Sequence, residues 1–503
     1  MSNTISISGK NSSNSRRVLK DYYEVVKGQV YVAIHKDEDG LLLYEVVEPP
    51  LTRDDEKIIN TIVKYLQERI YKEPLSIYLN GRISEKEFEE DIKDAIKKLK
   101  LKIEEPVLEK YIYYIKRDVL GFGKIDPLMK DPYIEDININ GPGRPVYVWH
   151  SLYEHLKTNI IFETSEELYN FIIKLSQKVG KQISSSNPIL EGLLPEKARV
   201  EVVLSDVAAQ GHMVNIRKFK SEPFTIIDLV LSGTLSPEAI AYLWLMLDYR
   251  RNVIIIGPTG SGKTTLLNAL LYLIRPEVRI VTIEDTREIY IPHDQWVPLV
   301  SRPSMSPQIR DVTLFDLVKV SMRIRPDYVV IGEIRGEEAF ALFQAFASGH
   351  AGLTTLHADS INNAIKRLLS KPMNVPLPLL TLASIFVNIQ RVKVNDAVAR
   401  RVVEIHELIG FNKRRPILNT VFKYNIVNDE IERASESKLF EDIAKIKFTS
   451  VKELKLELFK RKELIKAMVK YRFREPGTVF RIIRNYYLNP EGTLLKVSTG
   501  ALP

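Results

Sequence analysis

The sequence predicts an α/β fold whose core is a parallel sheet, preceded by a helical domain with a β-hairpin and by an α+β domain. Two observations predict the core. Short apolar segments at residues 253–256, 279–283 and 328–331 alternate with helical patterns, which is typical of strands covered on both faces. A glycine-rich loop at residues 257–265 directly follows the first of these strands and precedes a helix.

We expect six segments along the 503 residues. They are a disordered polar tail over 1–17, a first N-terminal domain over 18–120, a second, α+β N-terminal domain over 121–220, a linker over 221–232, the α/β core over 233–411, and a charged helical region over 412–503. The linker is placed where Ser-Glu-Pro interrupts the pattern, because proline ends regular structure.

The elements before the core follow from local patterns. Alternating apolar residues predict a hairpin over 30–47, and apolar residues three and four apart predict helices. Those helices are expected at 53–73, 84–100 and 105–119, and strands at 145–149, 159–162, 199–204 and 213–219. Thr164 and Glu167 form a capping box that begins a further helix. Residues 452–487 have the pattern of charged helices.

The composition limits the partners, the metal sites and the cellular location that we expect for the protein. The chain has 72 basic and 64 acidic residues, a net charge of +8 that permits an anionic partner without requiring one. It has no cysteine, which excludes disulfides and thiolate zinc sites, and its many charges favour a hot habitat. No apolar run reaches the roughly 20 residues needed to span a bilayer, so we expect a cytoplasmic protein.

The loop after residue 256 matches the phosphate-binding pattern G-x-x-x-x-G-K-[ST] in full. Its glycines let backbone N–H groups turn toward phosphate oxygens, Lys263 reaches the β- and γ-phosphates, and the Thr264 hydroxyl ligates Mg²⁺. We therefore predict that ATP binds to Gly257, Pro258, Thr259, Gly260, Ser261, Gly262, Lys263, Thr264 and Thr265.

Four acidic residues follow strands at the edge where ligands bind in such folds. Glu284, Asp285 and Glu288 follow the second strand, and Glu333 follows the third. Gly332 stands where most phosphate-loop enzymes carry aspartate, so Glu333 is expected to serve the metal through water. On the residues alone, any of the four acids is a candidate base. His350 and His357 mark the two ends of a small-residue strand.

Four segments in this order resemble the Walker A, Asp box, Walker B and His box of the type II/type IV secretion ATPase superfamily. They are 257–265, 282–288, 331–336 and 349–358, and the resemblance covers about residues 120–410. It implies a RecA-like core, with ATP and Mg²⁺ as cofactors. Residues 131–136 and 215–219 resemble the second N-terminal domain of that superfamily, and glycine at position 332 is usual within it.

The resemblance also implies residue roles. Glu288 would polarise the attacking water, while Glu333, with Glu284 and Asp285, would support Mg²⁺. His357 would couple the γ-phosphate side to motion. Arg199 and Arg217 match arginines that reach across a subunit boundary in a homohexamer, where a guanidinium stabilises the charge of the transition state.

The function expected from this resemblance is ATP hydrolysis that powers assembly of a type IV pilus-like filament. The ring would act at the cytoplasmic face on a polytopic membrane platform protein, peripherally associated with the membrane and with anionic lipid as a further partner. The composition looks archaeal, and an archaellum assembly or rotation motor is the first alternative. A nucleic-acid translocating motor is a second, although no specific nucleic acid is expected; a non-catalytic scaffold is a third.

Overall fold

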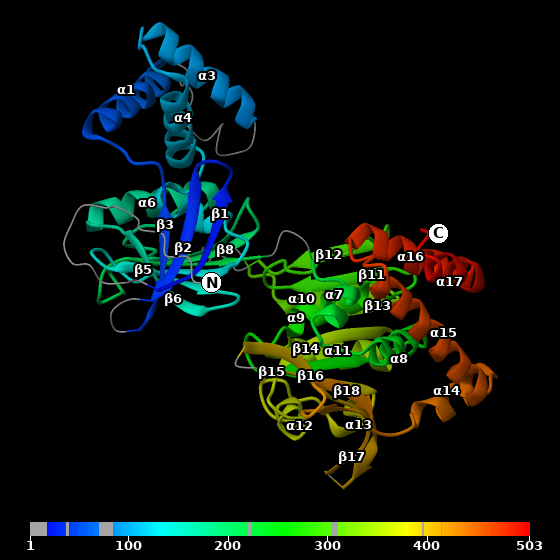
Figure 1. Ribbon diagram of the computed structural model, residues 1–503. Helices are drawn as coiled ribbons and strands as arrows, with labels where there is room; N and C mark the ends of the chain where they lie inside the picture. The colour runs from blue at the N-terminus through cyan, green and yellow to red at the C-terminus, as the bar shows by residue number, and fades with distance from the viewer. Residues whose placement is uncertain are drawn as a thin grey trace. The chain divides into compact units, whose positions relative to one another are not determined.

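The computed structural model describes residues 18–36, 40–69, 84–219, 223–302, 310–394, 397–413 and 415–502. The predicted disordered tail, 1–17, lies outside these ranges. The chain forms two compact units, Met1–Ser221 and Glu222–Pro503 (Figure 1). Each unit is described by itself.

The first unit is built on one nine-stranded sheet in the order β1-β2-β3-β6-β5-β4-β9-β8-β7. Its strands are β1 Val18–Val26, β2 Val30–Lys36, β3 Leu42–Val47, β4 Ile134–Ile139, β5 Pro145–His150, β6 Glu154–Ile161, β7 Ile189–Leu194, β8 Ala198–Val203 and β9 Met213–Lys218. Neighbouring strands are antiparallel except β3 and β6, which pair in parallel. The hairpin expected over 30–47 corresponds to β2 and β3.

This sheet crosses the boundary that the sequence suggested at residue 120. The sequence suggested two N-terminal domains, but β3 pairs directly with β6, and a fully buried carboxylate at Asp131 joins the two parts. The hydroxyls of Tyr23 and Tyr44 donate to Asp131 Oδ2 at 2.7 and 2.5 Å. Residues more than 80 positions apart make these contacts, so local sequence patterns carried no sign of them.

Three helices of the first unit lie close to predicted positions: α1 Arg53–Arg69, α3 Glu85–Lys98 and α4 Glu105–Val119. Helix α6 Ser165–Val179 begins at the predicted capping position, whereas the 3₁₀ turn η1 Gly123–Ile125 and the short α5 Asp126–Lys130 were not predicted. Thr164 caps α6 by accepting the N–H of Glu167, which is one half of the predicted capping box. The Glu167 carboxylate accepts the N–H of Glu163 and not that of Thr164.

The second unit contains the predicted parallel sheet, within a nine-stranded sheet of order β12-β11-β13-β14-β10-β15-β16-β17-β18. Its strands are β10 Val253–Gly257, β11 Ile280–Glu284, β12 Trp296–Val300, β13 Tyr328–Ile331, β14 Ala351–His357, β15 Ile385–Val394, β16 Ala397–Asn412, β17 Arg415–Asn425 and β18 Glu430–Arg433. From β12 to β15 all pairs are parallel, and from β15 to β18 all are antiparallel. The predicted α/β fold class is confirmed.

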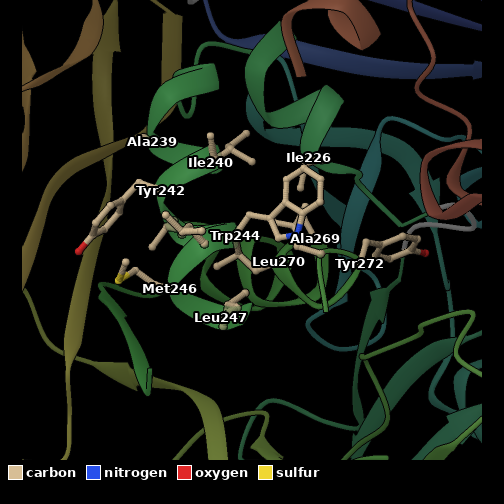
Figure 2. Packing of buried hydrophobic residues seen from close by; sticks show 14 of the residues in the cluster. Ile226, Ala239, Ile240, Tyr242, Trp244, Met246, Leu247, Ala269, Leu270 and Tyr272 are labelled. Atoms are coloured by element: carbon tan, nitrogen blue, oxygen red, sulfur yellow. The ribbon is translucent and has the colours of Figure 1, made fainter. Parts of the chain in front are cut away.

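Helices of this unit surround an apolar core. They are α7 Ile226–Leu231, α8 Pro237–Asp248, α9 Lys263–Leu271, α10 Leu314–Arg323, α11 Glu338–Ala347, α12 Ile361–Leu369, α13 Leu377–Leu380, α14 Leu439–Lys447, α15 Val451–Lys470, α16 Pro476–Leu488 and α17 Pro490–Ser498. Every residue from 239 to 247 in α8 is buried, and Figure 2 shows Tyr242, Trp244 and Met246 of this helix within the core. Such all-round burial explains why α8 is apolar on every face.

Two further expectations need correction. The helical region proposed for 412–503 begins with strands, because β17 and β18 extend the sheet of the core beyond residue 412. The linker proposed for 221–232 contains α7, whose Ile226, Ile227 and Leu229 are buried in the core. Of the described helices, none is long and apolar enough to cross a membrane.

A buried arginine fixes the C-terminal helices to the core. Arg461 of α15 donates from Nη2 to Asp248 Oδ2 at 2.7 Å and from Nε to Glu457 Oε1 at 2.9 Å. Its guanidinium carbon also lies 4.6 Å from the ring centre of Trp244, a cation–π distance. Because Arg461 and Asp248 are both almost fully buried, their charges depend on each other.

We predict that Arg461→Met destabilises the protein by roughly 3–5 kcal/mol, because it leaves the Asp248 carboxylate buried with one cation fewer. Denaturant unfolding monitored by circular dichroism measures the change. Lys466→Met is the matched control, since Lys466 forms an exposed pair with Glu463 on the same helix and should cost less than about 1 kcal/mol. Equal losses in the two variants would contradict the assignment.

Candidate nucleotide site

The phosphate-binding loop joins β10 to α9 and depends on three glycines. Gly260 and Gly262 have φ angles of +72° and +94°, in the left-handed region that favours glycine. A Cβ on Gly257 would lie 2.1 Å from the carbonyl oxygen of Ile389. The sequence pattern is therefore required by backbone geometry as well as by the chemistry of phosphate binding.

Lys263 is the first residue of α9, and its ammonium group points back across the loop. Nζ donates to the carbonyl oxygen of Pro258 at 2.9 Å and lies 3.1 Å from Nδ1 of His357. Burial lowers the pKa of Lys263 to about 8. The cation is thus held inside the loop, where a phosphate would replace contacts now made within the protein.

His357 connects this lysine to the acid of the third strand. Strands β10 and β14 pair in parallel with Gly257 opposite His357, which places the imidazole beside the loop. Nε2 lies 2.9 Å from Glu333 Oε1. Burial, followed by the charge of Lys263, lowers the pKa of His357 and so favours the neutral ring. In a neutral ring Nδ1 can accept from Lys263, while Nε2 lies beside the Glu333 carboxylate.

Arg335 extends this series of contacts. Its Nη2 lies 2.5 Å from Glu333 Oε2. The hydrogen bond to Glu333 raises the pKa of Arg335, and the charges of Asp285 and Glu288 raise it further. Glu333 pairs with this guanidinium, and Asp285 and Glu288 are near enough for their charges to act on it. We call Lys263, His357, Glu333 and Arg335 the charge chain of the site.

Glu284 anchors the loop that carries Asp285 and Glu288. Its Oε1 accepts the backbone N–H groups of Glu288 and Ile289 at 2.9 and 3.0 Å. Burial raises the pKa of Glu284 to about 7. A Cβ on Gly332 would lie 3.1 Å from Glu284 Cγ, so glycine after β13 leaves room for this side chain.

The other acids of this loop are exposed. Asp285 Oδ1 accepts the hydroxyl of Ser301 at 2.9 Å, which connects the ends of β11 and β12. Glu288 lies on the surface of the same loop. The structure thus brings Glu284, Asp285 and Glu288 to one edge of the sheet, and their catalytic and metal roles stay predictions.

Arg199 and Arg217 belong to the first unit, so their role toward the loop also stays a prediction. They are cross-strand partners on β8 and β9. Arg199 pairs with Glu191 and with Glu201, the latter at 3.4 Å. Arg217 pairs with Asp136 at 2.8 Å and keeps an exposed side chain. Adjacent guanidiniums on one strand pair make a local concentration of positive charge, partly balanced by these acids.

Three arginines near the loop were not among the site residues predicted from the sequence. Arg335 stands inside the Walker B segment, so its position was visible in the sequence. Arg391 and Arg400 are opposite each other on β15 and β16, and Arg400 Nε donates to the carbonyl oxygen of Gly260 at 3.2 Å. These two are more than 120 residues from the loop, and only the sheet order brings this hairpin to it.

The oxygen donors near the loop fit a magnesium ion that arrives with a nucleotide. No group of three or more histidine, aspartate or glutamate side chains able to hold a metal occurs within the described ranges. Mg²⁺ usually takes one or two protein oxygens together with water and phosphate. The half-buried Thr264 hydroxyl at the start of α9 and the Glu333 carboxylate supply such oxygens.

Comparisons with known proteins place related sequences among secretion proteins. The family model described as type II/IV secretion system protein matches residues 120–404. The uncharacterized protein MJ0900 of Methanocaldococcus jannaschii is 37% identical over 404 residues, covering 76% of this chain and 73% of the relative. The type IV secretion system protein PtlH of Bordetella pertussis is 29% identical over 316 residues, covering 56% and 92%.

Among solved structures, the VirB11 ATPase of the Brucella suis type IV secretion system is similar to this chain. It is 26% identical over 56% of this chain and 95% of its own length. The TM-score is 0.29, an overall superposition too loose to support a conclusion by itself.

The raised pKa of Glu284 predicts a pH-dependent stability. A carboxyl group with a folded pKa of about 7 stabilises the fold when protonated, and this contribution is lost as pH rises from about 4.5 through 7. As pH rises from 5 to 8, wild type should lose up to roughly 3 kcal/mol of stability that Glu284→Gln keeps, so the stability difference should shift in favour of the variant. Thermal unfolding at both pH values measures it.

Glu337→Gln is the control, because Glu337 is an exposed glutamate at the start of α11. Its difference from wild type should stay constant between the two pH values. A constant difference for Glu284→Gln as well would contradict the assigned pKa.

Proposed function

The chain belongs to the type II/IV secretion system protein family, and on this premise we propose that it binds ATP in loop 257–265 and hydrolyses it. One observation carries the proposal. The ammonium group of Lys263 is held at the mouth of a complete phosphate-binding loop by His357, which also contacts Glu333. A cation, a neutral imidazole and a carboxylate are thus aligned where a nucleotide phosphate would enter.

Each residue then has a physical role. Lys263 leaves the carbonyl oxygen of Pro258 and binds the β- and γ-phosphates, and backbone N–H groups of the loop hold the remaining oxygens. Thr264 and Glu333 would hold Mg²⁺, which supplies charge neutralisation of the phosphates when bound. Glu288 orients and polarises the attacking water. His357 loses its contact with Lys263 when that lysine moves to the phosphate. Because His357 also contacts Glu333, binding in the loop changes the surroundings of Glu333.

We further propose that this ATPase drives assembly of a type IV pilus-like filament from the cytoplasmic face of the membrane. It would act as a homohexamer on a polytopic membrane platform protein. Membership of a secretion family and the complete loop support a motor, and they disfavour a non-catalytic scaffold. An archaellum motor would use the same site, and neighbouring genes for pilins or for archaellins would distinguish these filaments.

A nucleic-acid motor receives less support. The basic and aromatic segment that favoured it, residues 471–487, mostly forms α16, whose Val479, Ile482, Ile483 and Tyr486 are buried. Those side chains serve packing. DNA that stimulates ATP turnover with a steep salt dependence would favour this alternative.

We predict that Glu288→Gln binds ATP normally but hydrolyses it about 10²–10⁴-fold more slowly, because the water loses its polarising group. Phosphate release measures turnover, and a fluorescent ATP analogue measures binding. Lys263→Ala is the companion variant and should lose binding as well. If Glu288→Gln keeps the wild-type rate, Glu333 or Glu284 becomes the better candidate for the base.

The hexamer proposal predicts that Arg217 acts on the nucleotide of a neighbouring subunit. Mixed rings of Arg217→Ala and Lys263→Ala subunits should regain hydrolysis at interfaces where an intact loop meets an intact arginine. Turnover across mixing ratios measures this recovery. Arg144→Ala, which removes an exposed arginine of the same unit, is the control and should leave homogeneous rings active. Absence of recovery would indicate an arginine acting within its own subunit.

A further inference from the structure

A cavity of about 550 Å³ lies beside the phosphate-binding loop, and the residue roles proposed for hydrolysis do not account for it. One wall is formed by Pro258 and Thr259 of the loop, and the other by α12 with Asn363, Lys366 and Arg367. His357, at the end of β14, lines the cavity between these walls.

The position of His357 relates this cavity to the phosphates. The imidazole contacts the ammonium group of Lys263 at 3.1 Å, and this lysine reaches the β- and γ-phosphates in such loops. His357 borders the cavity as well. The cavity therefore adjoins the terminal-phosphate end of the bound nucleotide, where the leaving phosphate first emerges.

The α12 wall brings two cations to this place. Among the described residues, none forms an ion pair or a hydrogen bond with the ammonium group of Lys366, which lines the cavity from an exposed position on α12. Arg367 Nη1 donates to the backbone carbonyl of His357 and so fixes the strand end that carries the imidazole. The two neighbouring cations therefore differ, because Arg367 is engaged with the site while Lys366 is available to an anion.

The one acid of the wall is already engaged. Asp359 Oδ1 accepts the amide of Asn363 at 2.7 Å, and this hydrogen bond lowers the pKa of Asp359. Asp359 is exposed at the start of α12. The negative charge of Asp359 reduces the positive potential of the cavity. The cavity therefore favours a small anion that contacts the Lys366 ammonium group directly over an anion attracted only by the overall positive charge.

We propose that this cavity is a subsite that receives the outer side of the terminal phosphoryl group that Lys263 binds, and then the inorganic phosphate released from it, with Lys366 as a second cation. Arg367 is a positioning residue that holds His357 toward Lys263. In the reaction, water oxygen bonds to the γ-phosphorus while the water gives a proton to Glu288, and the bond from that phosphorus to the bridging oxygen breaks, leaving ADP and phosphate. The phosphate then meets Lys366 before it reaches solvent. This inference rests on the proposed ATPase function.

The simpler interpretation is that Lys366 is an ordinary solvated lysine on a helix. The two interpretations predict different effects of Lys366 on the binding of ATP, ADP and free phosphate. A solvated lysine treats ATP and ADP alike, whereas a cation at the terminal-phosphate end favours ATP and free phosphate over ADP. A charged contact with phosphate is stronger than one between neutral groups, so the difference is measurable.

The test uses the full-length chain and the variants Lys366→Gln, Lys366→Arg and Lys452→Gln. Lys452 is an exposed lysine of α15, so its variant removes the same charge elsewhere in the unit. Isothermal titration measures binding of a non-hydrolysable ATP analogue and of ADP. Steady-state hydrolysis measures the concentration of inorganic phosphate that inhibits by half.

Lys366→Gln should weaken binding of the ATP analogue and raise the half-inhibiting phosphate concentration by about 5- to 10-fold. ADP binding should change by less than about twofold, which also shows that the variant is folded. Lys366→Arg keeps the charge and should restore both quantities, and Lys452→Gln should match wild type.

The subsite is wrong if Lys366→Gln and Lys452→Gln behave alike while wild type binds ATP and hydrolyses it. The proposed function fails, and the subsite with it, if wild type binds neither nucleotide. These two failures are therefore distinguishable in one set of experiments.

Discussion

The parallel pairing of β10 with β14 is the constraint on which the site depends. It sets Gly257 opposite His357, and so the first residue of the phosphate-binding loop and the imidazole stand at the same height of the sheet. The Lys263–His357 contact of 3.1 Å follows from this register. A shift by one residue would turn the imidazole to the other face of the sheet and break the charge chain.

The charge chain explains how one loop can be both stable and reactive. In the structure, Lys263 donates to Pro258 and contacts His357, and Glu333 pairs with Arg335 and lies beside His357. No member of this chain is left as an isolated buried charge, which would be costly. In the proposed function, a nucleotide phosphate would compete for Lys263 and so change the environment of His357 and Glu333. Occupancy of the loop would then be communicated from Lys263 to Glu333.

The remainder of the second unit supports this edge of the sheet. Helix α8 fills the core with apolar side chains on all faces (Figure 2). Arg461 holds α15 against the end of α8 through Asp248. The buried Glu407 of β16 accepts the hydroxyl of Tyr242 at 2.7 Å and the N–H of Lys438 at 2.8 Å. These polar contacts connect α8, the added antiparallel strands and the C-terminal helices. The segment after residue 412 is thus part of the same compact unit as the loop.

The sequence by itself determined the phosphate-binding loop, the three apolar strands beside it and the acids at their ends, because these signals are local and their chemistry needs fixed residue types. It also placed several helices through capping and periodicity, among them α1, α3, α4, α6, α9 and α15. Only the tertiary structure decided that one sheet joins the two expected N-terminal domains, that β17 and β18 extend the core, and that Arg400 and Lys366 lie near the loop. Each of these depends on pairing between distant segments, and such pairing leaves no periodic trace in either segment.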